Sequence, residues 1–231
     1  EARVTPTTTP ATVAIVGGHG HVALLLTRLL AAAGSRVLGI VRNPAQGSDI
    51  EAVGGIPVHL DIEVAGAEQL GEAIREADAL VFAAGAGPGS GPVRKLTVDL
   101  GGSVLAQRAA DMVGVRRFLQ LSAMVDRDPG PQADESWRAY VQAKREADAD
   151  LRATSLDWTI LRPGPLSFGS PTGCVRLGEP LEPGASDSPV PRADVATLLA
   201  ALLADRRSVR RTLDVVGGSA SIAAELNRVL G

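Results

Sequence analysis

The chain has one cysteine, one tyrosine and only two lysines, so that 21 of its 23 basic residues are arginines. A lone cysteine, Cys174, cannot form an internal disulfide bond or a cysteine-based zinc site. The longest apolar runs, Val22–Leu26 and Leu198–Leu203, fall far short of the ~20 residues that span a bilayer. The first residues also lack the basic and apolar regions of a signal peptide. We therefore expect a cytoplasmic protein.

An excess of basic charge is absent as well. The 26 acidic residues outnumber the 23 basic ones, which gives a net charge of −3 and argues against a general nucleic-acid or membrane-surface binder. A hydrophobic content of 45% excludes disorder as the overall state. The length favours one large domain, and we expect a flexible segment at 1–11 followed by a single domain at 12–231. The expected partner is a small-molecule substrate, and the sequence indicates no oligomeric state.

Short apolar runs alternate with longer helical patterns along the chain. The predicted strands are Thr12–Val16, Arg36–Val41, Pro57–Leu60, Ala79–Ala83, Arg117–Leu121 and Trp158–Leu161, with Thr212–Val216 as a candidate seventh. The predicted helices are Val22–Ala33, Ser48–Val53, Ala67–Glu76, a segment within Val93–Met112, Ser136–Arg152, Arg192–Ala204 and Ile222–Leu230. This alternation predicts an α/β protein with a doubly wound parallel sheet of six to seven strands and helices on both faces. The Gly- and Pro-rich stretch Pro163–Pro191 follows the sixth strand, where such sheets place substrate loops.

A glycine-rich turn, Gly17-Gly18-His19-Gly20-His21-Val22-Ala23, separates the first strand from the first helix. It fits G-x-x-G-x-x-A from Gly17 and G-x-G-x-x-A from Gly18, and the sequence does not distinguish these registers. Glycines permit a tight turn, and the N-terminus of the following helix attracts the diphosphate of a dinucleotide. The alternative is a purely structural turn. No G-x-x-x-x-G-K-[ST] motif of a nucleoside triphosphatase occurs.

The second strand ends at Val41-Arg42-Asn43, without the acid that commonly binds the ribose 2′-hydroxyl of NAD. Arg42 can instead bind a 2′-phosphate, so NADP(H) is favoured over NAD(H), unless Arg42 is only a solvated charge. Asp61, after the third strand, either contacts the adenine or caps the next segment. His19 and His21 lack the neighbouring ligands of a metal site and are expected at the edge of the turn.

The only tyrosine, Tyr140, precedes Lys144 by four residues, which is about one helical turn. Trp137, Tyr140, Lys144, Ala147 and Leu151 follow helical spacing and are expected to face inward. A nearby ammonium favours the phenolate of a tyrosine, which suits proton transfer to or from a carbonyl oxygen. Ser122 follows the fifth strand and could polarise that oxygen. The alternative is a surface helix with one buried aromatic side chain and a snorkelling lysine.

Together with Leu161-Arg162-Pro163-Gly164, these motifs resemble the atypical short-chain dehydrogenase/reductases, the group near flavin/biliverdin reductase B and the NmrA-like sensors. The resemblance implies a Rossmann-like fold and a catalytic trio of Ser122, Tyr140 and Lys144. It assigns the following residues to the cofactor: Gly17, Gly18, His19, Gly20, His21, Val22, Arg42, Asp61, Ala83, Ala84, Gly85, Lys144 and Pro163. The chain departs from the usual pattern at Ala23, where a glycine is common, and at Asp99, where reductases usually have asparagine.

Three functions are compatible with this resemblance. The first is an NADP(H)-dependent oxidoreductase that transfers a hydride between nicotinamide and a small carbonyl or quinone-like substrate. The second is a non-catalytic NADP(H)-binding sensor, although its expected mark is a broken Tyr/Lys pair, and here the pair is intact. The third, an epimerase or dehydratase of sugar nucleotides, is disfavoured because only 67 residues follow Gly164.

Overall fold

The structure is a computed structural model that describes residues 9–87, 89–125, 130, 132–181 and 188–231. Most of the N-terminal segment expected to be flexible therefore lies outside the described residues. Its last residues join the fold, because the Pro10 carbonyl accepts a hydrogen bond from the Ser35 hydroxyl at 2.8 Å. No helix in the described ranges is both long and apolar enough to cross a membrane.

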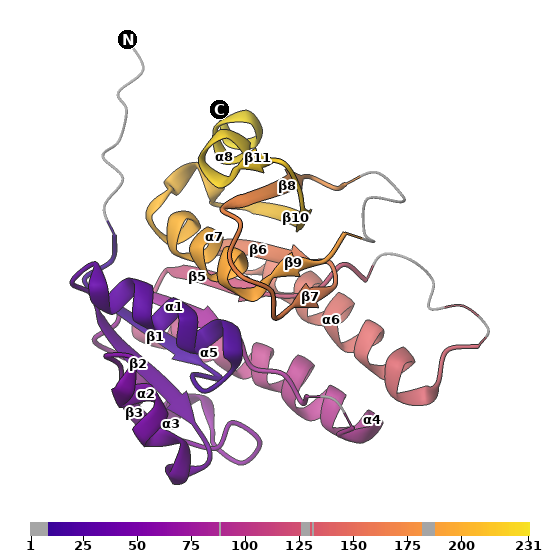
Figure 1. The fold of residues 1–231 in the computed structure, drawn as a ribbon. Coiled ribbons are helices and arrows are strands. Elements are labelled where there is room, and N and C mark those ends of the chain that lie inside the picture. The colour runs from indigo at the N-terminus through magenta and orange to yellow at the C-terminus, as the bar shows by residue number, and fades with distance from the viewer. Residues whose placement is uncertain (1–8, 88, 126–129, 131, 182–187) are drawn as a thin grey trace.

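The central sheet is mostly parallel and confirms the predicted α/β architecture (Figure 1). Its parallel strands run in the order β3-β2-β1-β4-β5-β6-β10. These strands are β1 (Thr12–Val16), β2 (Arg36–Val41), β3 (Ile56–His59), β4 (Ala79–Phe82), β5 (Arg117–Leu121), β6 (Asp157–Pro163) and β10 (Arg211–Gly217). They correspond to the six strands and the candidate seventh that the apolar runs predicted.

The sheet contains more strands than predicted, because it has nine in all. Beyond β10 it is extended by two antiparallel strands, β8 (Cys174–Gly178) and β11 (Ala220–Ser221). A separate pair is formed by β7 (Leu166–Ser167) and β9 (Val190–Pro191). The stretch 163–191, predicted as a loop, thus includes strands on either side of residues 182–187, which lie outside the description. Its glycines and prolines hid the alternation of β8, whose Val175 and Leu177 are buried.

Helices cover both faces of the sheet, as the doubly wound pattern predicted (Figure 1). One face packs against α1 (His21–Ala32) and α7 (Arg192–Ala204), and the other packs against α3 (Ala67–Ile74), α5 (Gly102–Val113) and α6 (Glu135–Ala153). The shorter helices are α2 (Gly47–Ala52), α4 (Gly91–Arg94) and α8 (Ile222–Leu230). In β1, Val13 and Ile15 contribute to one apolar cluster and Ala14 and Val16 to the other, as period-2 alternation requires. Strands buried on both faces need such continuous apolar sequence.

The helix predicted within Val93–Met112 contains an irregularity that affects the site. Between α4 and α5 the chain forms a π-helix, η2 (Lys95–Gly101). Wide turns of this kind are rare and often occur at functional sites. Here the turn includes the buried polar side chains Lys95 and Asp99, and it packs against α6.

The strand order reverses at β1, which lies between β2 and β4. Connections leave in opposite directions at this point, and the crevice at the carboxyl ends of the strands is where doubly wound proteins bind ligands. The glycine turn is held there, because the N–H groups of Gly17 and Gly18 both donate to the Ile40 carbonyl, at 3.1 and 3.0 Å. A Cβ atom on Gly18 would lie only 2.7 Å from the Cα of Gly39.

We predict that Gly18→Ala destabilises the fold, because its methyl group would meet backbone rather than a movable side chain. The free energy of unfolding, measured by urea denaturation, should fall by about 1–3 kcal/mol. Gly169→Ala is the control, since this exposed position has its nearest contact at 3.5 Å and should change stability by less than about 0.5 kcal/mol. Equal stability of the two variants would contradict the close packing at Gly18.

Candidate functional site

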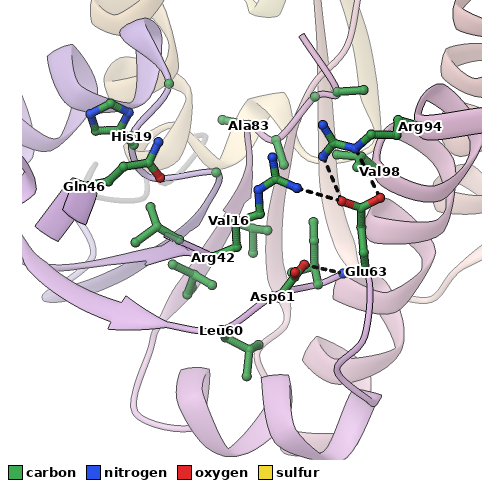
Figure 2. Close-up of a pocket in the computed structure, with 18 residues that line it drawn as sticks. Val16, His19, Arg42, Gln46, Leu60, Asp61, Glu63, Ala83, Arg94 and Val98 are labelled. Carbon is green, nitrogen blue, oxygen red and sulfur yellow. Dashed lines mark hydrogen bonds and ion pairs between the residues drawn. The ribbon is translucent and has the colours of Figure 1, made fainter. Parts of the chain in front are cut away.

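A cavity of about 300 Å³ opens at the crevice between the ends of β1, β2 and β4 (Figure 2). It is lined by eight of the residues that the sequence analysis assigned to a cofactor: Gly17, His19, Gly20, Arg42, Asp61, Ala83, Ala84 and Gly85. Three others of that set, Gly18, His21 and Val22, do not line it. Gly18 packs against β2 instead, and the ring of His21 packs edge-on against Phe168 at 5.1 Å.

The glycine turn leaves a seat for an anion at the start of α1. Gly17 has φ +81°, and a Cβ atom on it would lie 2.5 Å from the Cα of Ala84. Gly20 is the N-cap of α1, which has no side-chain cap and no acidic residue in its first turn. The N–H groups of His21 and Val22 therefore lack intrahelical acceptors and are available to a ligand. These positions match the register that starts at Gly17, and the seat fits a diphosphate.

Arg42 is exposed at the end of β2, and it also belongs to an ion-pair cluster around Glu63 (Figure 2). The Glu63 carboxylate accepts hydrogen bonds from Arg42 at 3.1 Å, Arg94 at 2.8 Å and Thr97 at 2.7 Å. Hydrogen bonding from Arg94, and next from Thr97, lowers the pKa of Glu63. Asp61 does cap the following segment, since its side chain accepts from the Glu63 N–H at 2.9 Å, and it also lines the cavity.

A second and larger cavity, of about 920 Å³, lies beside the first and shares the lining residues Ala83, Ala84 and Gly85 with it. It brings together all three predicted catalytic residues, Ser122, Tyr140 and Lys144, with Pro163 at the end of β6. These residues follow β5, lie on α6 and end β6, so the parallel sheet places them at one edge. The two cavities together connect the glycine turn to Tyr140.

Lys144 is buried and forms an ion pair with Asp99 at 3.0 Å. Burial is the largest single effect and disfavours the charged ammonium, but Asp99, Tyr140 and Asp148 together outweigh it, so that the pKa of Lys144 is raised. The other oxygen of Asp99 accepts from the Ala86 N–H at 3.0 Å. Asp99, which replaces the usual asparagine, thus pairs with Lys144, the lysine of the predicted trio.

The structure corrects one expectation about Tyr140. The sequence analysis expected the Lys144 ammonium to favour the phenolate, and Lys144 does act in that direction. Burial is the larger effect, however, and Asp99 and Asp148 add to it, so that the pKa of Tyr140 is raised. Because these effects together exceed that of Lys144, the phenol of Tyr140 is harder to ionise than an ordinary one.

Both lysines of the chain lie at Tyr140. The ammonium nitrogens of Lys95 and Lys144 are 5.4 and 5.7 Å from the centre of its ring. Trp137 stacks on the same ring, with centroids 5.3 Å apart. The predicted inward stripe is confirmed for Lys144 and the residues after it, whereas Trp137 is exposed because it lies at the mouth of the cavity.

A buried polar network lies beneath Ser122. Asp148 accepts a hydrogen bond from Gln120 at 2.8 Å, and Gln120 in turn accepts one from Ser103. Burial raises the pKa of Asp148, and polar neighbours such as Gln120 oppose that rise. The network links α5, β5 and α6 and so supports the position of Ser122.

Sequence reasoning missed five charged residues of the two cavities, Glu63, Arg94, Lys95, Asp134 and Arg192. Glu63 and Arg94 belong to no motif and give no local signal. Lys95 could have been noticed as one of only two lysines. Arg192 is the first residue of α7 and is distant in sequence from the other site residues.

Comparison with known proteins agrees with this geometry. A family model described as NAD(P)H-binding matches residues 17–206. The UPF0659 protein YMR090W of Saccharomyces cerevisiae is 38% identical over 217 residues, which cover 91% of this chain and 95% of the yeast protein.

Two solved structures are similar over nearly the whole chain. One, named "Putative NAD-dependent epimerase/dehydratase from Bacillus halodurans", has a TM-score of 0.86 and 33% identity, and the match covers 95% of this chain and 100% of that one. The other is the oxidoreductase ylbE from Lactococcus lactis, with a TM-score of 0.80 and 26% identity over 95% of this chain and 96% of that one.

Because Tyr140 is the only tyrosine, ultraviolet absorbance of its ionised phenol reports its pKa directly. We predict a midpoint above the ordinary value of 10.0 in the protein without ligands. Lys144→Met should raise the midpoint further, by about one pH unit, because the opposing ammonium is lost while Asp99 remains. Asp148→Asn should shift it the opposite way, and circular dichroism would check that both variants fold. A wild-type midpoint at or below 10.0 would show that the phenolate is favoured after all.

Proposed function

The chain belongs to the NAD(P)H-binding family, and from this premise we propose that it is an NADP(H)-dependent oxidoreductase of the short-chain dehydrogenase/reductase type. Its substrate is a small carbonyl or quinone-like compound. The observation that carries the proposal is the pair of adjoining cavities, one at the glycine turn and one at Tyr140, joined through Ala83, Ala84 and Gly85.

The residues present fit a dinucleotide. The N-terminus of α1 would hold the diphosphate, Asp61 and the segment after β4 would lie near the adenosine, and Lys144 and Pro163 would lie near the nicotinamide riboside. A bound nicotinamide cofactor supplies the hydride of the reaction. The chain must then supply a proton and a binding site for the substrate oxygen.

The chain's own residues can supply the proton that reduction of a carbonyl needs. The raised pKa of Tyr140 keeps its phenol protonated at neutral pH, so that it can donate its proton to the carbonyl oxygen. The Ser122 hydroxyl, at the edge of the same cavity, would donate a hydrogen bond to that oxygen. Lys144, held by Asp99, stabilises the negative charge that remains on Tyr140 after the proton has left.

The preference for NADP(H) rests on the cluster around Glu63. Arg42 and Arg94 both contact this carboxylate, and both line the smaller cavity (Figure 2). A 2′-phosphate presents the same kind of acceptor as a carboxylate, with more negative charge. We therefore assign the 2′-phosphate to the two arginines, with Glu63 as the group that it displaces.

Two alternatives remain as outcomes of the tests. The name of the Bacillus halodurans structure favours an epimerase or dehydratase, which would use the cofactor without net consumption of NADPH. A sensor would bind NADPH and turn over nothing. Consumption of NADPH with a substrate thus separates the oxidoreductase from both.

The catalytic assignment predicts NADPH oxidation with members of a panel of small aldehydes, ketones and quinones. Tyr140→Phe should lower kcat by about 10²-fold or more, because the proton donor is lost. Its affinity for NADPH, measured by quenching of tryptophan fluorescence, should stay within about twofold, which is the control for correct folding. Turnover by the variant at the parental rate would refute the role of Tyr140.

The cofactor assignment predicts opposite effects of two substitutions on NADPH affinity. Arg42→Ala should weaken the binding of NADPH by about tenfold and leave NADH nearly unchanged, since only NADPH carries the 2′-phosphate. Glu63→Gln should strengthen the binding of NADPH by about tenfold, because it frees both arginines and removes a repelling charge.

Glu72→Gln is the matched control for Glu63→Gln, because Glu72 forms a similar pair with Arg75 on the exposed side of α3 and lines neither cavity. It should leave both affinities unchanged. Equal affinity of the wild-type protein for NADPH and NADH would contradict the assignment.

A further inference from the structure

We propose that the larger cavity takes a substrate that carries an anionic group of the carboxylate type, and that Arg192 recognises this group. The inference rests on the proposed function, because it names the substrate class of the cavity around Tyr140. It goes beyond that function by assigning a binding role to a residue that no motif singled out.

The charges that line the larger cavity do not balance. Its cationic side chains are Lys95, Lys144 and Arg192, and its carboxylates are Asp99 and Asp134. Asp99 is paired with Lys144, and Asp134 caps α6 by accepting from the N–H of Trp137 at 2.6 Å, which leaves its charge in place. The lining therefore carries one net positive charge.

Lys95 and Arg192 are the cations that remain. Lys95 donates to the Gly87 carbonyl at 2.7 Å, which satisfies a hydrogen bond and leaves the charge in place. Within the described part of the chain, neither Lys95 nor Arg192 has a carboxylate at ion-pair distance. A concave site with excess positive charge attracts anions.

Arg192 is held in position before any ligand binds. It is the first residue of α7 and follows β9 directly, and β9 pairs with β7 through Val190 and Leu166. The guanidinium carbon lies 3.8 Å from the centre of the Phe168 ring, which covers one face of the planar group. Stacking of this kind leaves the N–H donors at the edge free to bind in the plane.

One nitrogen of the Arg192 guanidinium lacks the hydrogen bond that buried polar atoms usually make. The Nη1 atom of Arg192 is buried, and in the described ranges it has no hydrogen-bond partner. Native structures satisfy nearly all buried polar atoms, so an unsatisfied guanidinium nitrogen at a cavity wall indicates a missing ligand. A carboxylate matches the planar fork of a guanidinium and can accept two parallel hydrogen bonds from it.

The other lining residues of the larger cavity indicate the nature of the rest of the substrate. Trp137, Met124, Leu166 and Pro165 provide apolar surface around Tyr140. The cavity therefore fits an apolar or aromatic carbonyl compound with one acidic substituent. The diphosphate of the cofactor is the competing anion, because Phe168, on which Arg192 stacks, also contacts His21 at the start of α1.

The test uses an acid and its uncharged methyl ester, 4-carboxybenzaldehyde and methyl 4-formylbenzoate, each with NADPH. The wild-type protein should favour the acid, and Arg192→Gln should raise KM for the acid by roughly tenfold while leaving the ester almost unchanged. Arg192→Lys should retain part of the preference, because it keeps the charge and loses the fork. Arg176→Gln is the matched control, since Arg176 is exposed on β8 and lines neither cavity, and it should change neither substrate.

A binding measurement separates failure of this inference from failure of the proposed function. Benzoate, added to protein saturated with NADP⁺, should quench tryptophan fluorescence through Trp137, with roughly tenfold weaker binding in Arg192→Gln. If benzoate binds in this Arg192-dependent way but neither aldehyde is reduced, the anion site stands and the oxidoreductase does not. If the aldehydes are reduced but the variant affects acid and ester equally, or weakens NADPH instead of benzoate, Arg192 is not the substrate's anion site.

Discussion

The buried ion pair between Lys144 and Asp99 is the interaction on which the site depends. Its atoms are 3.0 Å apart and both side chains are almost fully buried. Such pairs add little to stability, yet removal of one partner typically costs about 3–5 kcal/mol, because a buried charge is left alone. The pair therefore acts mainly as a positional constraint, because it links the π-helix η2 to α6. It fixes Lys144 next to Tyr140, which lies one helical turn before Lys144 on α6. Asp99 also opposes the effect of the ammonium on Tyr140, and with burial as the largest effect the pKa of Tyr140 is raised.

The parallel sheet provides the second constraint, because it delivers every loop of the site to one edge. The glycine turn, Arg42 and Ser122 follow β1, β2 and β5, so that all three lie at the carboxyl edge of the sheet although they are distant in sequence. The two cavities form one path across this edge, and they share the short segment after β4. Each cavity is lined by an arginine, the smaller one by Arg42 and the larger one by Arg192. This arrangement suits the ligands that we propose, with the 2′-phosphate of the cofactor at Arg42 and the anionic group of the substrate at Arg192.

The chain uses arginine and lysine in different places. The chain uses arginine for its surface pairs and for the cluster around Glu63, where planar, bidentate binding is useful. Its two lysines are both buried, and both approach the ring of Tyr140. A compact ammonium can lie close to a phenol and respond to its charge, whereas a guanidinium is broader and stays charged at all accessible pH. Both of the rare lysines thus lie at the cavity in which we propose the reaction.

The sequence by itself determined the parallel strands, the glycine turn and the offset of Tyr140 from Lys144. Each of these depends on neighbours within a few residues, through apolar periodicity, the conformational freedom of glycine or the pitch of a helix. Only the tertiary structure decided that Glu63 joins Arg42 to Arg94, that Asp99 neutralises Lys144, and that the Tyr140 phenol stays protonated. It also turned part of the stretch 163–191 into strands. Charges and pKa values depend on distances through space and on burial, and these exist only once segments far apart in the chain have packed together.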